Sequence, residues 1–232
     1  MEVLPILGCL VLAITFMILF DQARKDLPIA AKPVNRVGRP MKIVNEKNEP
    51  VDILKNEVTE QRLASLYIQP SDIVLELGAR YGSVSCMINA KLTNPAMHVA
   101  VEPDQTVWEA LEQNRHVNAS AFRIFQGTIG RKGVFIRSDK GYGTQTVAKD
   151  EGETLPFCSV DDLGLPFTTL VADCEGCLPT FFQDFPDMYD RLHTVIFEAD
   201  AGANYAEIQK QLASHGFQPI VQGFQNVWMK SR

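Results

Sequence analysis

The fold is decided by the stretch Asp72-Ile-Val-Leu-Glu-Leu-Gly-Ala-Arg-Tyr-Gly82, which is followed by Val99-Ala-Val-Glu-Pro103. An apolar strand leads into a turn with Gly78 and Gly82, a helical segment follows, and a second apolar strand ends at Glu102. In doubly wound sheets this arrangement holds a nucleotide-like cofactor, because the glycines admit the ligand and the carboxylate accepts hydrogen bonds from a ribose. The stretch therefore predicts a Rossmann-like fold with a cofactor site.

Outside this stretch, apolar strands alternate with amphipathic helices. Strands are predicted over residues 73–78, 97–103, 122–127, 167–173 and 194–199, with a closing pair over 217–221 and 226–230. Helices are predicted over residues 52–67, 83–90, 106–118, 179–185 and 203–215, and a glycine-rich hairpin and loop over 130–157. Such alternation is typical of an α/β domain with a mainly parallel sheet.

Composition is that of an ordinary globular domain, and it limits the expected partners. Of the 232 residues, 46% are hydrophobic and 22% are charged, which is enough to bury one core. The formal net charge of −6 argues against a general nucleic-acid-binding protein, since such proteins are usually basic. No nucleic-acid partner is therefore expected.

The five cysteines do not indicate a disulfide framework, because their number is odd and the chain is not small. Cys174 and Cys177 have the spacing of a redox or zinc pair, but no second pair of ligands accompanies them, so no metal is expected. We therefore favour the interpretation that they are two small side chains at the end of a buried strand, and reduced thiols suit the expected cytosolic domain.

The N-terminal region predicts a membrane anchor. Residues 3–20 are almost entirely apolar, which is just long enough to span a bilayer, and the charges around them favour a retained anchor over a cleaved signal peptide. Basic residues follow, which predicts that the globular domain faces the cytoplasm. We expect an anchor over residues 1–20, a linker over 21–50 and the folded domain over 51–232.

The residues of the first turn indicate which cofactor is bound. A dinucleotide site usually shows Gly-x-Gly-x-x-Gly, and this turn lacks the third glycine and carries the bulky Arg80 and Tyr81. A carboxylate at Glu76 repels phosphate but suits a cationic ligand. S-adenosyl-L-methionine has a sulfonium and an amino group and no phosphate. Glu76 and Glu102 therefore favour it over NAD, although an NAD-dependent reductase stays a competing hypothesis.

The chain also resembles the FkbM-type family of S-adenosylmethionine-dependent methyltransferases. The matching stretches lie between residues 70 and 200, in the order and spacing of that family: Val74–Ser85, Val101–Pro103, Thr128–Gly130, Val160–Leu163, Val171–Gly176 and Val195–Glu198. The resemblance implies a seven-stranded class I methyltransferase sheet with helices on both faces and an antiparallel last strand.

The resemblance also implies roles for individual residues. Glu76, Gly78 and Gly82 are expected at the methionine end of the cofactor. Glu102 is expected at the ribose, and Gly127 and Thr128 near the adenine. Asp173 and Glu175 are expected to face cofactor and acceptor as candidate catalytic residues.

These roles predict O-methylation of a small molecule, a sugar or a lipid headgroup near a membrane, with Asp173 or Glu175 as the base. Two departures from the family pattern, Arg80 in place of Asn and Leu178 in place of Glu, favour the alternative of a catalytically silent binding or scaffold protein. A metal-dependent enzyme is a further alternative if Asp173, Glu175 and Glu198 converge.

Overall fold

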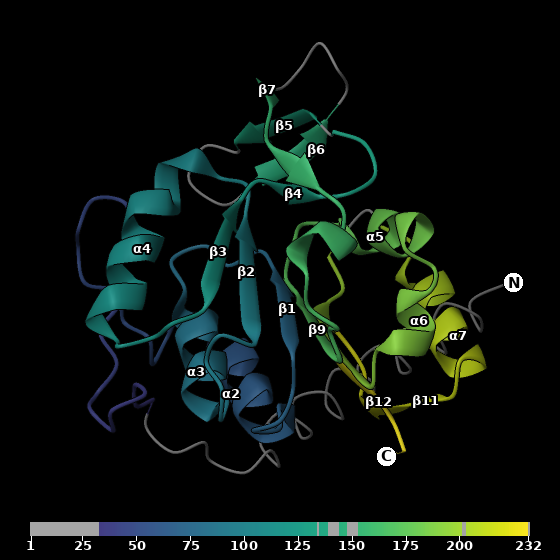
Figure 1. Cartoon of the computed structure of the whole chain (residues 1–232), viewed down its shortest axis with the longest axis horizontal. Helices are drawn as coiled ribbons and strands as arrows, with labels where there is room; N and C mark the ends of the chain where they lie inside the picture. Colours follow the sequence, from purple (N-terminus) through teal and green to yellow (C-terminus); the bar gives the residue numbers. More distant parts are fainter. Residues whose placement is uncertain (1–32, 134, 139–143, 148–152, 201–202, 232) are drawn as a thin grey trace, which may run out of the picture. The chain divides into compact units, whose positions relative to one another are not determined.

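The computed structural model describes residues 33–133, 135–138, 144–147, 153–200 and 203–231 (Figure 1). The helices are α2 (Val58–Tyr67), α3 (Ser83–Lys91), α4 (Trp108–Val117), α5 (Leu178–Asp184), α6 (Met188–Arg191) and α7 (Tyr205–Ser214). The strands of the main sheet are β1 (Val74–Leu77), β2 (His98–Glu102), β3 (Arg123–Gln126), β9 (Thr169–Ala172), β10 (Thr194–Glu198), β11 (Phe217–Val221) and β12 (Gln225–Lys230). The short strands are β4 (Thr128–Ile129), β5 (Phe135–Ser138), β6 (Thr144–Val147), β7 (Glu153–Thr154) and β8 (Phe157–Cys158).

The main sheet has seven strands in the order β11-β12-β10-β9-β1-β2-β3. β3, β2, β1, β9 and β10 pair in parallel, whereas β12 is antiparallel to both β10 and β11. This confirms the predicted seven-stranded sheet with an antiparallel last strand. Because β1 and β9 are neighbours while the chain continues from β1 to β2 on the other side, the strand order reverses between β1 and β9, where such sheets bind ligands.

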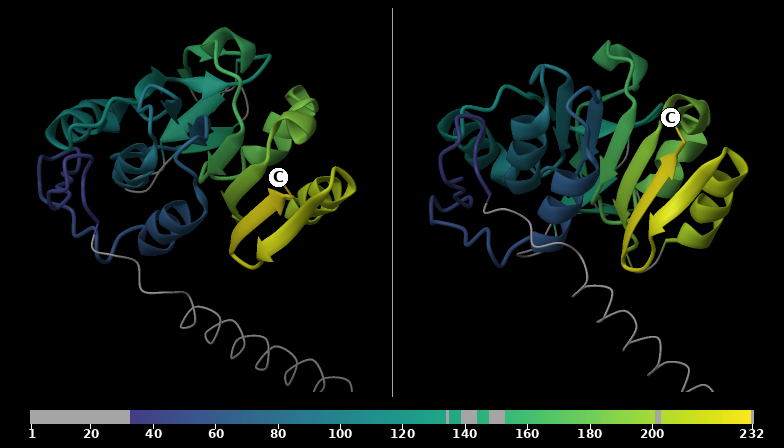
Figure 2. Two further views of the ribbon diagram at one scale, coloured as in Figure 1. Left: turned by 60° about the horizontal axis from the view of Figure 1, so that its bottom comes forward. Right: turned by 90° about the horizontal axis from the view of Figure 1, so that it is seen from below.

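Helices cover both faces of the sheet, as Figure 2 shows. On one face α2 and α3 pack on β1, β9, β10 and β12 through Leu63, Ile88 and Val171. On the other face α5, α6 and α7 pack on the same sheet through Phe181, Leu212 and Phe197. The central strands β1, β2 and β9 are buried along their whole length and are mostly apolar, as expected for a parallel sheet covered by helices.

Residues 33–53 lie against α3 and α4 rather than standing apart from them. Met41 and Ile43 are buried with Leu111 of α4 in one apolar cluster. Asn114 accepts a hydrogen bond from the backbone N–H of Val44 at 2.9 Å and donates to its carbonyl at 2.8 Å. Most of this segment belongs to the stretch assigned to a linker from composition, and the division at residues 20 and 50 stays a prediction.

The expected localisation is corrected by the structure: no helix among the described residues is both long and apolar enough to cross a membrane. Residues 3–20, for which the membrane helix is predicted, lie outside the described residues. The expectation of a single-pass membrane protein with a domain in the cytoplasm is withdrawn on this finding.

Candidate functional site

The site forms where β1 and β9 end side by side. Gly78 follows β1 in a left-handed conformation, with φ +86°. A Cβ on Gly78 would lie 1.7 Å from the carbonyl oxygen of Asp173, the residue that follows β9. Only glycine fits there, because the two strand ends touch through their backbones. Gly82, the residue before α3, also has a left-handed conformation, with φ +82°, and a Cβ there would lie 2.7 Å from the side chain of Leu111.

A small pocket opens at this junction and is lined by four carboxylate side chains together with Gly78, Gln225 and apolar residues. The four are Glu57, Glu60, Glu76 and Asp173. Burial raises the pKa of Glu57 and Asp173, that of Asp173 to about 8, and the charges of neighbouring carboxylates add to the effect. So many carboxylates around one small space favour a ligand with positive charge.

Glu76 is fixed in this wall by a partner on the next strand. The carboxylate is 1% exposed and its Oε2 lies 3.0 Å from Nε2 of His98, which is completely buried in β2. Among the described residues, Nδ1 of His98 has no hydrogen-bond partner. A histidine on the neighbouring strand therefore holds the Glu76 carboxylate in place.

Glu102 ends β2 and is held by the glycine-bearing turn. The backbone N–H of Arg80 donates to Glu102 Oε2 at 2.5 Å, and that of Asp104 donates to Oε1 at 2.7 Å. Burial raises the pKa of Glu102 to about 7. Arg80 itself has φ +45°, a conformation that favours glycine or asparagine. The left-handed conformation at Arg80 therefore accompanies a turn whose backbone N–H donates to the Glu102 carboxylate at the end of β2.

Gly127 and Thr128 follow β3 next to Glu102. The backbone N–H of Gly127 donates to the carbonyl of Glu102 at 3.0 Å, and that of Thr128 donates to Pro156 at 3.0 Å. A Cβ on Gly127 would lie 2.1 Å from the carbonyl oxygen of Pro156. The close approach of the Pro156 backbone therefore requires glycine at position 127. Gly127 and Thr128 lie at the same sheet edge as Glu102.

The ends of β9 and β10 bring three carboxylates together. One oxygen from each of Asp173, Glu198 and Asp200 lies within 4.8 Å of the others. Burial and the charges of Asp173 and Asp200 raise the pKa of Glu198, and Gln225 donates a hydrogen bond to it at 2.5 Å. We call these three residues the carboxylate trio. Glu175 is exposed and does not belong to the trio.

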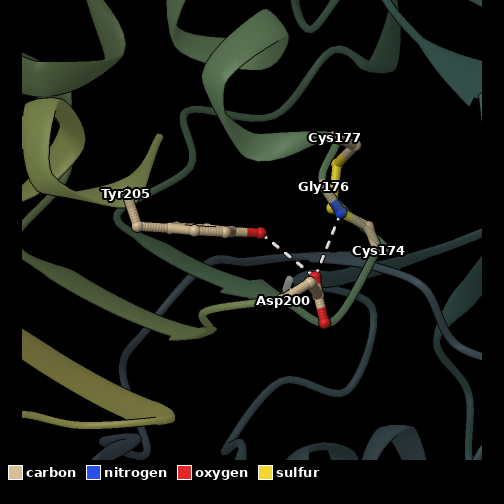
Figure 3. The surroundings of a disulfide bond; sticks show 5 residues. All are labelled: Cys174, Gly176, Cys177, Asp200 and Tyr205. Atoms are coloured by element: carbon tan, nitrogen blue, oxygen red, sulfur yellow. Dashed lines mark hydrogen bonds between the residues drawn. A yellow bond between two sulfur atoms is a disulfide. The ribbon is translucent and has the colours of Figure 1, made fainter. Parts of the chain in front are cut away.

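The loop between β9 and α5 is closed by a disulfide bond between Cys174 and Cys177. The expectation that these two thiols are reduced is therefore wrong. Cys86 and Cys158 are free. Inside the loop, the backbone N–H of Gly176 donates to Asp200 Oδ2 at 3.0 Å (Figure 3). The disulfide-closed loop is thus attached directly to the carboxylate trio.

Three contributors to this site were missed by the sequence analysis. Glu57 and Glu60 reach the pocket from the α2 region, and Asp200 joins the trio two residues beyond the end of β10. The alternation of strands and helices carries no signal for Glu57 and Glu60, because they precede the fold-defining stretch. Asp200 follows Glu198 at the tip of a predicted strand, and this position was its only sequence signal.

Comparisons with known proteins identify the fold. No protein-family model matches the chain, and no curated protein sequence is similar to it. Among solved structures, precorrin-6y C5,15-methyltransferase from Geobacter metallireducens matches with a TM-score of 0.50 and 14% identity, over 78% of this chain and 91% of that one. This match and the strand order of the main sheet together show that the chain has the class I methyltransferase fold. The FkbM family itself gains no support from the comparisons.

Two further similar structures carry a cofactor or its product. A putative tRNA (m1A22) methyltransferase from Streptococcus pneumoniae, in complex with S-adenosyl-L-methionine, matches with a TM-score of 0.45 and 10% identity, over 75% and 73% of the two chains. TrmK of M. capricolum, in complex with S-adenosyl-homocysteine, matches with a TM-score of 0.43 and 10% identity, over 74% and 68%.

These structures correct one expectation. Solved structures similar to the chain include one described as a putative tRNA methyltransferase and one described as a putative RNA methyltransferase, and the expectation that no nucleic acid is a partner is therefore withdrawn. The net charge of the whole chain was its only basis, and net charge does not decide what a single site accepts.

Proposed function

We propose that this protein is an S-adenosyl-L-methionine-dependent methyltransferase. The observation that carries the proposal is the pocket between the ends of β1 and β9, where four carboxylates surround a glycine that permits close backbone approach. The pocket lies where the strand order of the sheet reverses, which is where folds of this kind bind their ligands. A cationic, phosphate-free cofactor suits these walls, whereas a pyrophosphate would be repelled by them.

Residues along this sheet edge offer a partner for each part of that cofactor. Glu76, with Gly78 and Gly82 beside it, would hold the positively charged methionine end, because His98 keeps the Glu76 carboxylate in place. Glu102 would accept the ribose hydroxyls. Gly127 and Thr128 would border the adenine, since they lie at the same sheet edge next to Glu102.

The chemistry would follow from positioning and proton removal. The bound cofactor supplies an electrophilic methyl group for in-line displacement. Holding an acceptor oxygen against that group is worth about 7–11 kcal/mol of the barrier. Asp173 lies at the pocket and its pKa of about 8 is near neutral pH, where a general base works best. We propose Asp173 as the base for the acceptor hydroxyl, with Glu175 on the exposed loop facing the acceptor.

The finer proposal is O-methylation of a hydroxyl on a small molecule or sugar by an FkbM-type enzyme. The motif resemblance and the base at Asp173 support it. The competing hypothesis is a silent protein of the same fold, for which Leu178 was an argument. Leu178 is 1% exposed at the start of α5 and contributes to the core there, so its replacement of a glutamate reflects packing at this position.

A transfer assay tests the proposal. Full-length protein is incubated with methyl-tritiated S-adenosyl-L-methionine and separate panels of hydroxyl-bearing small molecules, sugars and RNA. We expect transfer by the wild type, and a loss of at least about 100-fold in Asp173→Asn with cofactor binding intact. Unchanged transfer by Asp173→Asn would remove this residue from the role of base. Cofactor binding without transfer in every panel would favour the silent protein.

A further inference from the structure

The loop that carries the disulfide contacts two members of the carboxylate trio: it starts directly after Asp173, and its Gly176 donates a hydrogen bond to Asp200. Its first cysteine, Cys174, directly follows Asp173 at the end of β9, and Cys177 directly precedes α5. Between them, Glu175 has φ +50° and Gly176 has φ +89°. A side-chain-bearing residue disfavours this left-handed conformation, so the two-residue turn depends on its surroundings. The covalent bond across the turn is one such restraint, because it limits how far the two ends can separate.

The turn has one direct contact with the trio. The N–H of Gly176 donates to Asp200 Oδ2 at 3.0 Å, and the hydroxyl of Tyr205 donates to the same oxygen at 3.1 Å (Figure 3). Tyr205 is itself buried and stacks on Phe197 of β10, so its hydroxyl is a fixed donor. The Gly176 N–H also donates to this oxygen, and it is held by a loop rather than by a packed helix. The position of Asp200 therefore depends on the state of the loop.

We propose that Cys174 and Cys177 form a reversible thiol–disulfide switch that holds Asp200 in the carboxylate trio. Both cysteines are partly exposed, so a dithiol reductant reaches them. In thiol–disulfide exchange the reductant's thiolate attacks one sulfur, and the bond between the cysteines breaks. Two electrons and two protons pass to the cysteine thiols, while the reductant closes to its own disulfide. The turn then loses its cross-link, and Gly176 leaves Asp200 more often.

The oxidised protein is the assembled state of the site. With the disulfide closed, residues 173–177 form one cross-linked stretch. This stretch contains both Asp173 and the Gly176 N–H that donates to Asp200. With the disulfide open, Asp173 keeps the hydrogen bond from its N–H to the carbonyl of Leu77 at 3.0 Å, whereas Asp200 keeps the Tyr205 hydroxyl but loses its second donor, the Gly176 N–H, more often. The functional consequence, that redox state controls methyl transfer, rests on the proposed function. The structural switch itself does not.

The test is hydrogen exchange on the full-length protein, followed by mass spectrometry of the peptide that spans residues 173–181. Protein purified without reductant is compared with the same protein in excess dithiothreitol, and alkylation counts the free thiols in each sample. We expect two additional alkylated cysteines on reduction, and an exchange of the Gly176 region that is about tenfold faster, equivalent to ~1.4 kcal/mol. Peptides from α4 should not change.

Two variants complete the design. The double variant C174A/C177A should exchange as fast as reduced wild type whether or not reductant is present. Cys158→Ser, which removes a free, partly exposed cysteine, should respond to reductant as wild type does. Equal exchange in oxidised and reduced wild type would overturn the switch, and so would a pair that is already fully alkylated without reductant.

The outcome is independent of the proposed function. S-adenosylhomocysteine binding is measured in both redox states of the same samples. If neither state binds it while exchange responds to reduction, the cofactor proposal fails and the switch stands. If both states bind it and exchange does not respond, the switch fails and the cofactor proposal stands.

Discussion

The carboxylate pocket makes the protein less stable as pH rises, and Asp173→Asn should remove part of this effect. The pKa of Asp173 is raised from 3.8 to about 8, because the side chain is buried and because Glu57 and Asp200 are negatively charged. Between these two values the carboxyl group is protonated in the folded protein and ionised in the unfolded chain. The unfolded chain then binds fewer protons, so the free energy of unfolding falls as pH rises through this window.

The magnitude follows from the width of the window. Each pH unit within it corresponds to ~1.4 kcal/mol for one group, so the interval from pH 5 to pH 8 amounts to at most about 4 kcal/mol. The charges of Glu198 and Asp173 repel each other. In the wild type, protonation of Glu198 already removes part of this repulsion, so replacing Asp173 gains less than the full amount. We therefore expect Asp173→Asn to gain roughly 2 kcal/mol more over wild type at pH 8 than at pH 5.

The assay is urea unfolding followed by tryptophan fluorescence at both pH values. Glu109→Gln serves as the matched control, because Glu109 is an exposed carboxylate on α4, outside the pocket. Its effect should stay within about 0.5 kcal/mol and be the same at both pH values. An Asp173→Asn gain that is equal at pH 5 and pH 8, or a loss at pH 8, would refute the reasoning.

Three further predictions concern the turn, the buried pair and the ribose site. Gly78→Ala should destabilise by ~3 kcal/mol, because its Cβ would overlap a backbone carbonyl. Gly164→Ala, with φ +69° but open space around it, should cost only about 1 kcal/mol in thermal unfolding, and equal effects would contradict the steric argument. His98→Leu leaves buried Glu76 without its partner and should cost about 3–5 kcal/mol in urea unfolding, whereas a neutral result would show that the pair is dispensable. Because burial raises the pKa of Glu102 to about 7 and only its ionised form accepts both ribose hydroxyls, S-adenosylhomocysteine affinity should fall ~tenfold per pH unit below pH 7. A flat calorimetric pH profile would argue against that role.

The centre of the main sheet was predictable because β1, β2, β9 and β10 are short, mostly apolar runs bounded by turn residues. β1 and β2 are each one residue shorter at both ends than the predicted ranges 73–78 and 97–103. The helix α6 was not predicted, since Met188–Arg191 is a single turn of four residues and shows no periodicity. Tertiary contacts, not local sequence, determine an element of that size.

The segment before the sheet shows what composition alone cannot reveal. Residues 33–50 contain Pro, Lys and Asn, and this composition indicated a tether. Their place beside α4 depends on side chains that look like surface residues in the sequence. Asn114 and Asn118 are almost completely buried, and their amide groups bond to the backbone of Val44 and Lys42. Such long-range pairs leave no periodic signal.

The candidate site was predictable only where it coincides with strand ends. Gly78, Glu102 and Asp173 follow directly from the parallel sheet, because the carboxyl ends of its strands meet at one edge. Glu57 and Asp200 become neighbours of Asp173 only through the packing of α2 and the path of the chain after β10. The spacing of Cys174 and Cys177 was visible in the sequence, but their bond was not.

The central claim is that the carboxylate-lined sheet edge binds S-adenosyl-L-methionine, and isothermal calorimetry on the full-length protein tests it most directly. Wild type is titrated at pH 7.5 beside Glu102→Ala, with thermal unfolding to show that both are folded. We predict micromolar binding by wild type that Glu102→Ala weakens by at least about 30-fold, since a buried hydrogen-bonding carboxylate is lost. No binding by a folded wild-type protein, or equal binding by both proteins, would contradict the account.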